Sequence, residues 1–191
     1  MTVKCYKLKT STTQYSVVLA RIEAQVFQEV LRLVDDVNRR SGKTGILMQA
    51  IRDNCVINPK HVLAILYHSI EAFYRKSNIA DKLYMEILLR ISGVRQIKDA
   101  IRVAGISEAG VVWIICLSEK ADCSMLLQFL NSEIKNMKNI RLLDFYSNRP
   151  ALQKIISQLN LDRKTLESLS GELEERAVKA AIMRAALMHI I

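Results

Sequence analysis

Residues 61–105 read HVLAILYHSIEAFYRKSNIADKLYMEILLRISGVRQIKDAIRVAG and predict three consecutive short helices. The first is expected to have Asn58 as its cap and Pro59 at the first helical position, where no backbone donor is needed. The second is expected to open at Ser77 or Asn78 and to end at Gly93, because glycine accepts the left-handed conformation that terminates helices. Apolar residues at helical spacing mark the faces that we expect to be buried: Val62, Ile65, Leu66, Ile70 and Phe73, then Leu83, Ile87, Leu88 and Ile91, then Ile97, Ala100, Ile101 and Ala104.

Outside this stretch, strands and helices alternate along the chain. Val111–Leu117 is a continuous apolar run rich in β-branched residues, which is typical of a strand buried on both faces of a sheet. Ile22–Arg40 has apolar residues at helical spacing and predicts an amphipathic helix, followed by a polar turn up to Gly45. The other expected strands are Met1–Lys9, Tyr15–Ala20 (or the start of the next helix), Ile46–Ile51 and an edge strand at Ile140–Phe145. The other expected helices are Ala121–Met137, Ala151–Leu159, one from Asp162 to near Gly171, and Glu172–Ile191.

This order of elements predicts an α/β (α+β) fold. We expect a small mixed β-sheet packed with several helices, in which each element buries one apolar face. The chain of 191 residues is long enough for one compact domain, and no repeat or linker divides it. The expected organisation is therefore a single domain over residues 1–191 with a helical C-terminal part.

The charge balance and the cysteines limit the environment and the partners. The chain has 28 Lys and Arg against 19 Asp and Glu, a net charge of +9, which favours an acidic partner such as nucleic acid but also occurs in basic proteins without one. No segment reads as a signal peptide, and no apolar run is long enough to span a bilayer, so we expect a cytoplasmic protein that does not use a membrane. The four cysteines include no Cys-x-x-Cys pair, which favours reduced thiols, with a disulfide as the lesser alternative.

Several catalytic and cofactor patterns can be weighed and set aside. Ser41–Gly45 resembles part of a phosphate loop, but the glycine that the pattern needs is replaced by Val37 within a predicted helix. His61 and His68 lie two helical turns apart, about 10 Å, which is too far to share one metal ion easily. We therefore expect no metal and no cofactor. One enzymatic alternative stays open: Cys55 as a nucleophile with His61 as its base.

A basic cluster follows Gly93, where a helix is expected to begin. It consists of Arg95, Gln96, Lys98 and Arg102. Helix N-termini attract phosphate and arginine adds bidentate donors, so a single-stranded RNA end could be gripped here. The alternative is a solvated helix face on which Arg95 pairs with a nearby carboxylate.

The last helix is the second candidate surface, because it is apolar on more than one face. Its candidate partner-binding residues are Leu173, Ala177, Ala180, Arg184, Leu187 and Met188. Such a helix is either buried in its own domain or covered by a partner, for which methionines are well suited. A homodimeric adaptor unrelated to RNA would also cover this helix.

The central stretch also resembles a known family, the CGI-type kinase-binding subunits of the KEOPS/EKC complex. The resemblance covers roughly residues 46–118 well and the flanks loosely. It rests on His61-x-x-Ala64, Ala72-Phe73, Asn78-Ile79-Ala80, Glu86-Ile87-Leu88, Ser92-Gly93-x-Arg95-Gln96-Ile97, Ala100-Ile101 and Gly105-Ile106.

This resemblance implies a non-enzymatic subunit with two macromolecular partners. One would be the kinase/ATPase subunit of the complex, which it would bind and stimulate. The other would be tRNA, held at its 3′ CCA end for threonylcarbamoyladenosine modification at position 37. With the resemblance, the expected RNA-binding residues are His61, Arg95, Gln96, Lys98 and Arg102.

Overall fold

The computed structural model describes residues 3–188 and divides the chain into two compact units. The sheet unit contains the chain up to Asp53 and Ile106–Asn148, and the helical unit contains Asn54–Gly105 and the chain from Arg149 onward. The α/β (α+β) prediction is confirmed. The expected single domain over residues 1–191 stays a prediction.

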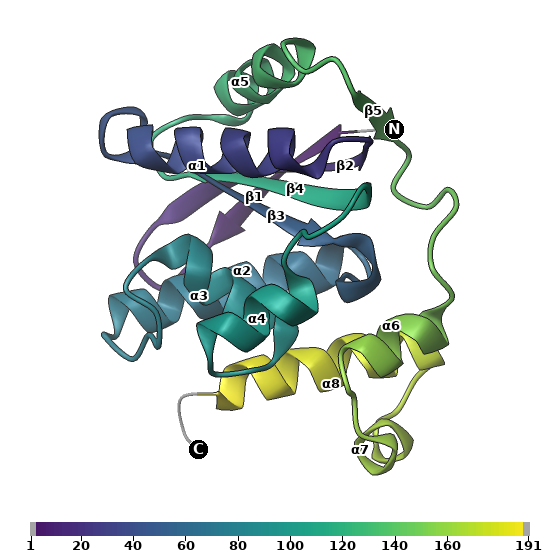
Figure 1. Cartoon of the computed structure of the whole chain (residues 1–191). Coiled ribbons are helices and arrows are strands. Elements are labelled where there is room, and N and C mark those ends of the chain that lie inside the picture. The colour runs from purple at the N-terminus through teal and green to yellow at the C-terminus, as the bar shows by residue number, and fades with distance from the viewer. Residues whose placement is uncertain (1–2, 189–191) are drawn as a thin grey trace. The chain divides into compact units, whose positions relative to one another are not determined.

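The sheet unit is built on five strands (Figure 1). Their order is β1-β2-β4-β3, with β5 paired to β2, and every pairing is antiparallel rather than mixed. The outer edge of β2 is shared, because β1 pairs with its first part and β5 with Arg21–Ala24. The strands are β1 (Val3–Lys9), β2 (Gln14–Ala24), β3 (Ile46–Arg52), β4 (Gly110–Ser118) and β5 (Ile140–Leu143).

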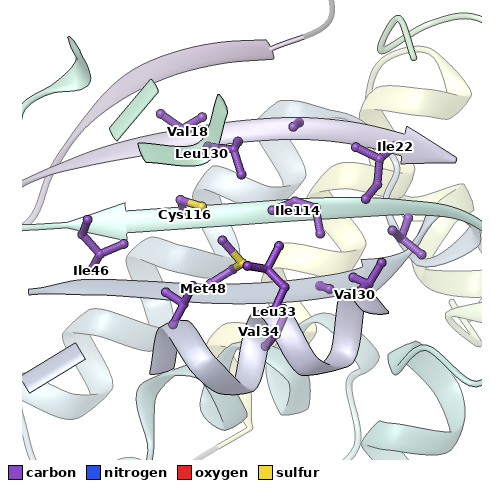
Figure 2. Packing of buried hydrophobic residues seen from close by; sticks show 14 of the residues in the cluster. Val18, Ile22, Val30, Leu33, Val34, Ile46, Met48, Ile114, Cys116 and Leu130 are labelled. Atoms are coloured by element: carbon purple, nitrogen blue, oxygen red, sulfur yellow. The ribbon is translucent and has the colours of Figure 1, made fainter. Parts of the chain in front are cut away.

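The predicted central strand is confirmed as β4, which is buried from Val112 to Ser118 between β2 and β3. One face of the sheet packs against α1 (Phe27–Thr44) and α5 (Cys123–Lys135). Figure 2 shows side chains of α1 meeting those of β3 and β4 in this core. The core residues labelled there are Val18, Ile22, Val30, Leu33, Val34, Ile46, Met48, Ile114, Cys116 and Leu130.

The predicted helix Ile22–Arg40 is wrong at both ends. Ile22 lies in β2, where it alternates with Ala20 and Ala24 toward the core, and the helix begins only at Phe27. At its other end α1 continues to Thr44, and Gly45 caps it with a left-handed φ of 67°. The predicted polar turn is therefore the last turn of the helix.

The helical unit contains the three helices predicted from residues 61–105 and the C-terminal helices. Its members are α2 (Pro59–Tyr74), α3 (Leu83–Ser92), α4 (Ile97–Ala104), α6 (Leu152–Gln158), α7 (Arg163–Ser168) and α8 (Leu173–Leu187), and the short 3-10 turn η1 (Asp53–Cys55) precedes α2. The Asn58 cap is confirmed, since its side chain accepts a hydrogen bond from the backbone N–H of His61 at 3.0 Å. The predicted start of the second helix at Ser77 or Asn78 is wrong, because α3 begins at Leu83. The expected last helix ran to Ile191, and its final three residues lie outside the described range.

The expectation that all four cysteines are free thiols is also wrong. Cys5 of β1 and Cys123 of α5 form a disulfide, with their Cα atoms 5.8 Å apart. Cys55 and Cys116 are free and buried. Burial raises the pKa of the Cys116 thiol far above its usual range. The disulfide joins β1, a strand at the edge of the sheet, to the helix that packs beside it.

Candidate functional site: a hollow beside helix α8

The small residues of α8 lie inside the helical unit. Ala177, Ala181 and Ala185 are almost completely buried, and α8 packs against α2, α3 and α7. Alanines let neighbouring helices approach closely, so this stripe forms the unit's own core. Of the expected partner-binding residues, Ala177, Ala180 and Met188 are buried, Leu173 and Arg184 are half-buried, and Leu187 is exposed.

A hollow of about 380 Å³ opens at the C-terminal half of α8. Its residues come from the turn after α3, the connection between α6 and α7, α7, and α8 with the residue that follows it. Most of the surface that lines it is apolar, although half of its lining side chains are polar or charged. The lining residues are Gly93, Arg95, Asn160, Leu161, Asp162, Thr165, Ala180, Met183, Arg184, Leu187 and Met188. Four of the expected partner-binding residues and one expected RNA-binding residue therefore share one hollow.

Arg184 joins the parts of this wall. Its guanidinium donates hydrogen bonds to the backbone carbonyls of Leu159 and, at 3.3 Å, of Ser92. A Cβ on Gly93 would overlap the guanidinium of Arg184 and displace it, and the left-handed φ of 70° at this position also favours glycine. Burial lowers the pKa of Arg184, and its buried Nε has no partner among residues 3–188. This N–H is a donor that a ligand or water could use.

Four of the expected RNA-binding residues, three of them cationic, lie at the surface of the same unit. Arg95, Gln96, Lys98 and Arg102 are all exposed, and Arg95 borders the hollow. Arg102 pairs with Asp99 at 2.9 Å, but both side chains are well exposed, so this pair holds the guanidinium weakly. The cluster therefore presents positive charge to solvent next to an apolar-lined hollow.

His61 does not join this surface. It is fully buried, and its Nδ1 accepts a hydrogen bond from the backbone N–H of Ile57 at 3.3 Å. Burial, with the nearby guanidinium groups of Arg184 and Arg149, lowers the pKa of His61 from 6.5 to about 3. The imidazole is therefore neutral at pH 7 and supplies no charge to a ligand. An RNA-binding role for His61 stays a prediction that burial does not favour.

The enzymatic alternative finds little support in the environment of Cys55. The residue is fully buried, and its Sγ donates to the carbonyl of Val103 at 3.2 Å. A nucleophilic thiol needs access to substrate and a base that can take its proton. Burial of both Cys55 and His61 instead favours a structural role for the pair.

The helical unit exposes apolar residues that the sequence did not assign to the surface. Sequence reasoning did not single out Met183 as a surface residue, although it lines the hollow and is 46% exposed. Ile97 and Ile101 of α4, expected to be buried, are both exposed by more than two fifths.

Within residues 3–188, no group of three potential ligand side chains could hold a metal ion, and none of the helices there has the length and apolarity to cross a bilayer.

Comparison with known proteins finds a matching family model and similar curated proteins. A family model described as kinase binding protein CGI-121 matches residues 32–185. The regulatory protein Cgi121 of Methanocaldococcus jannaschii is 37% identical over 84 residues, which are 44% of this chain and 54% of that protein. The KEOPS complex subunit Cgi121 of Pyrococcus abyssi is 38% identical over 84 residues, 42% of this chain and 48% of that protein. The chain thus spans about half the length of the curated relatives it matches.

Proposed function

The chain belongs to the CGI-121 family of kinase binding proteins, and on that premise we propose that it is a non-catalytic subunit of a cytoplasmic KEOPS complex. It binds and stimulates the kinase/ATPase subunit of that complex. It also helps to recruit tRNA, through its 3′ CCA end, for threonylcarbamoyladenosine modification at position 37. The observation that carries the proposal is the family match, which extends over both units of the chain.

The RNA part of the proposal is supported by the hollow beside α8. The faces of unstacked bases gain free energy when apolar groups remove them from water, and Leu161, Met183 and Leu187 supply such groups in the wall of the hollow. Arg95 at the border places a positive charge where a phosphate would follow the bases. Gln96, Lys98 and Arg102 continue the positive or polar surface along α4.

Arg95→Glu is expected to weaken the binding of a single-stranded RNA that ends in CCA by at least about tenfold. The variant loses one phosphate contact and adds a repelling charge, so the slope of log affinity against log salt should fall by about 0.7 or more. Gel-shift titrations at several salt concentrations measure both quantities. Arg39→Glu, at an exposed arginine of α1, changes the net charge equally and should bind like the wild type. Equal binding by Arg95→Glu and the wild type would contradict the proposed RNA site.

The kinase part of the proposal is supported by the exposed apolar residues at the end of α8. Met183 and Leu187 lie one helical turn apart, and each is more than two fifths exposed. Such residues are suited to a partner interface, and because both also line the hollow, we expect the kinase to contact them at its rim, beside the RNA end. The buried members of the expected partner-binding set, Ala177, Ala180 and Met188, would support this surface from beneath.

Leu187→Glu is expected to weaken binding to a KEOPS kinase subunit by about tenfold or more, because the interface would bury an unpaired charge. Calorimetric titration of the full chain with the purified kinase subunit measures this affinity. Leu31→Glu is a matched control, since Leu31 of α1 is 41% exposed and Leu187 is 44% exposed. If the kinase binds the wild type and both variants equally, the end of α8 is not the contact surface.

A further inference from the structure

The disulfide of the sheet unit lies where solvent can reach it. Cys5 and Cys123, which form this bond, are both half-buried, whereas Cys116 of the same unit is completely buried. The strand register places Cys5 opposite Val18 and Val18 opposite Cys116, so Cys116 lies two strands from Cys5, at about 10 Å. A disulfide spans no more than about 7 Å between Cα atoms. Cys5 can therefore pair with Cys123 but not with Cys116.

The two free thiols do not compete with this bond for thiol reagents. Cys55 in the helical unit and Cys116 in the sheet unit are both completely buried. The thiolate is the reactive form of cysteine, and burial raises the pKa of Cys116, so this thiol stays protonated. Disulfides exposed to solvent are exchanged more readily than enclosed ones. Thiol chemistry on the folded chain is therefore directed to the bond between Cys5 and Cys123.

The two elements that the bond joins are less deeply buried than the centre of the sheet. No residue of β1, from Val3 to Lys9, is fully buried, and among the described strands β1 pairs with β2 alone. Of the 13 residues of α5, only Leu126 and Leu130 are buried. The central strand β4, in contrast, is buried from Val112 to Ser118. Segments with few buried apolar contacts open at a lower free energy, so the disulfide supplies a large share of what holds β1 and α5 together.

We propose that Cys5–Cys123 is a redox exchange site, which a dithiol reductant opens in the folded protein, and that its opening loosens β1 and α5 while β4 stays ordered. A thiolate of the reductant attacks one sulfur of the bond and forms a mixed disulfide, and the other cysteine leaves as a thiolate. The second thiol of the reductant then attacks the mixed disulfide and releases the first cysteine. The reductant ends as an internal disulfide, and its two protons and two electrons end on the two cysteine thiols.

Opening the bond changes the stability of the chain because the two cysteines are 118 residues apart in sequence. A disulfide that closes a long loop removes much of the conformational entropy of the unfolded chain. Reduction should therefore raise the equilibrium constant for unfolding on the order of 100-fold. Disulfides of cytosolic proteins are usually transient or redox-sensing, whereas those of hyperthermophiles are commonly permanent. A permanent disulfide would stay closed in the folded protein, and an exchange site would open.

The first test treats the folded full-length protein with dithiothreitol, alkylates it with N-ethylmaleimide and maps the adducts by peptide mass spectrometry. Cys5 and Cys123 should be alkylated, and Cys55 and Cys116 should react only after denaturant is added. The reduced protein should melt about 5–15 °C below the oxidised protein, and oxidised dithiothreitol should restore the higher melting temperature. A bond that stays closed in the folded protein would overturn the proposal, as would equal melting temperatures of the two forms.

The control for the reductant itself is Cys5→Ser/Cys123→Ser, which cannot form the bond. Its melting temperature should equal that of the reduced wild type within a few degrees and should not change when dithiothreitol is added. A drop in the melting temperature of this variant in dithiothreitol would show that the reductant acts elsewhere, and would overturn the proposal.

Hydrogen exchange at increasing urea concentrations tests where the reduced protein opens. In the reduced wild type, the amides of β1 and α5 should exchange through an opening of lower free energy and weaker urea dependence than the opening that exposes β4. In the oxidised protein, that separate opening should disappear or shift to a higher free energy. If β1, α5 and β4 share one opening with the same urea dependence in both forms, reduction destabilises the chain only as a whole, and the proposed loosening of β1 and α5 is wrong.

Discussion

Asp53→Ala is expected to lower the free energy of unfolding by about 3–5 kcal/mol, because it leaves a buried arginine without its counter-charge. Arg21 is completely buried, and its Nε and Nη2 donate to the Asp53 carboxylate at 2.8 and 2.7 Å. The same carboxylate accepts from Nε1 of Trp113 at 2.7 Å. Since whole proteins are stable by about 5–15 kcal/mol, this single substitution should remove a large share of the total.

The effect should be large for a second reason. Arg21 also donates to the backbone carbonyls of Asp144, Ser147 and Asn148, the last residues of the sheet unit before the chain enters α6. Phe145 in this segment is fully buried and stacks on Trp113, with the ring centroids 5.0 Å apart. Without the carboxylate, burial of the charged Arg21 guanidinium becomes unfavourable. If Arg21 turns toward solvent, the segment from Asp144 to Asn148 loses the hydrogen bonds that hold it to β2.

Urea unfolding followed by fluorescence measures this effect, because Trp113 is the only tryptophan and lies in the cluster itself. Asp36→Ala is the matched control. It breaks an ion pair with Arg39 in which both side chains are more than half exposed, and should change the free energy by no more than about 0.5 kcal/mol. The double variant Arg21→Met/Asp53→Leu should be less destabilised than the sum of the two single changes. A change below about 1 kcal/mol in Asp53→Ala would show that desolvation nearly cancels the attraction between the two groups.

The sequence correctly predicted those elements that are determined by residues within or next to them. The continuous apolar run of β4 and the Asn58–Pro59 start of α2 are examples, since burial and capping act within a few residues. The end of α1 could not be read in this way. Its polar last turn stays helical partly because the Asn38 side chain bonds both the N–H and the C=O of Met48, across the turn into β3. A bond to a different element has no signature in the local sequence.

In the candidate site, too, some features follow from the local sequence and others depend on residues far along the chain. The exposure of Arg95, Gln96, Lys98 and Arg102 follows from their place in the sequence, and the structure agrees with it. The hollow depends on the return of α8 to α3, which residue spacing cannot reveal. The burial of His61 has a similar origin, because Arg149 and Arg184, far along the chain, lie close to it. The predicted start of α3 was wrong because the backbone N–H groups of Ile79 and Ala80 donate to the Glu86 side chain and not to a nearby helix cap.

Glu86→Gln is therefore expected to have the second large effect, a loss of about 3 kcal/mol or more in the free energy of unfolding. The amide has nearly the same shape as the carboxylate, but its nitrogen is a donor and would face either Arg90 or the backbone N–H groups of Ile79 and Ala80. The charge of the buried Arg90 would also be left without a carboxylate partner. Glu167→Gln breaks another pair at the same i, i+4 spacing, with Arg163, but at an exposed site, so its melting temperature should stay close to that of the wild type.

Hydrogen exchange separates a local effect of Glu86→Gln from a general loss of stability. The backbone amides of Ile79 and Ala80 should exchange much faster in the variant, because their acceptor is weakened, while the amides of the central strand β4 keep their order of protection. Unchanged exchange at Ile79 and Ala80 would contradict the claim that Glu86 fixes the connection between α2 and α3, because their protection would then not depend on the Glu86 carboxylate.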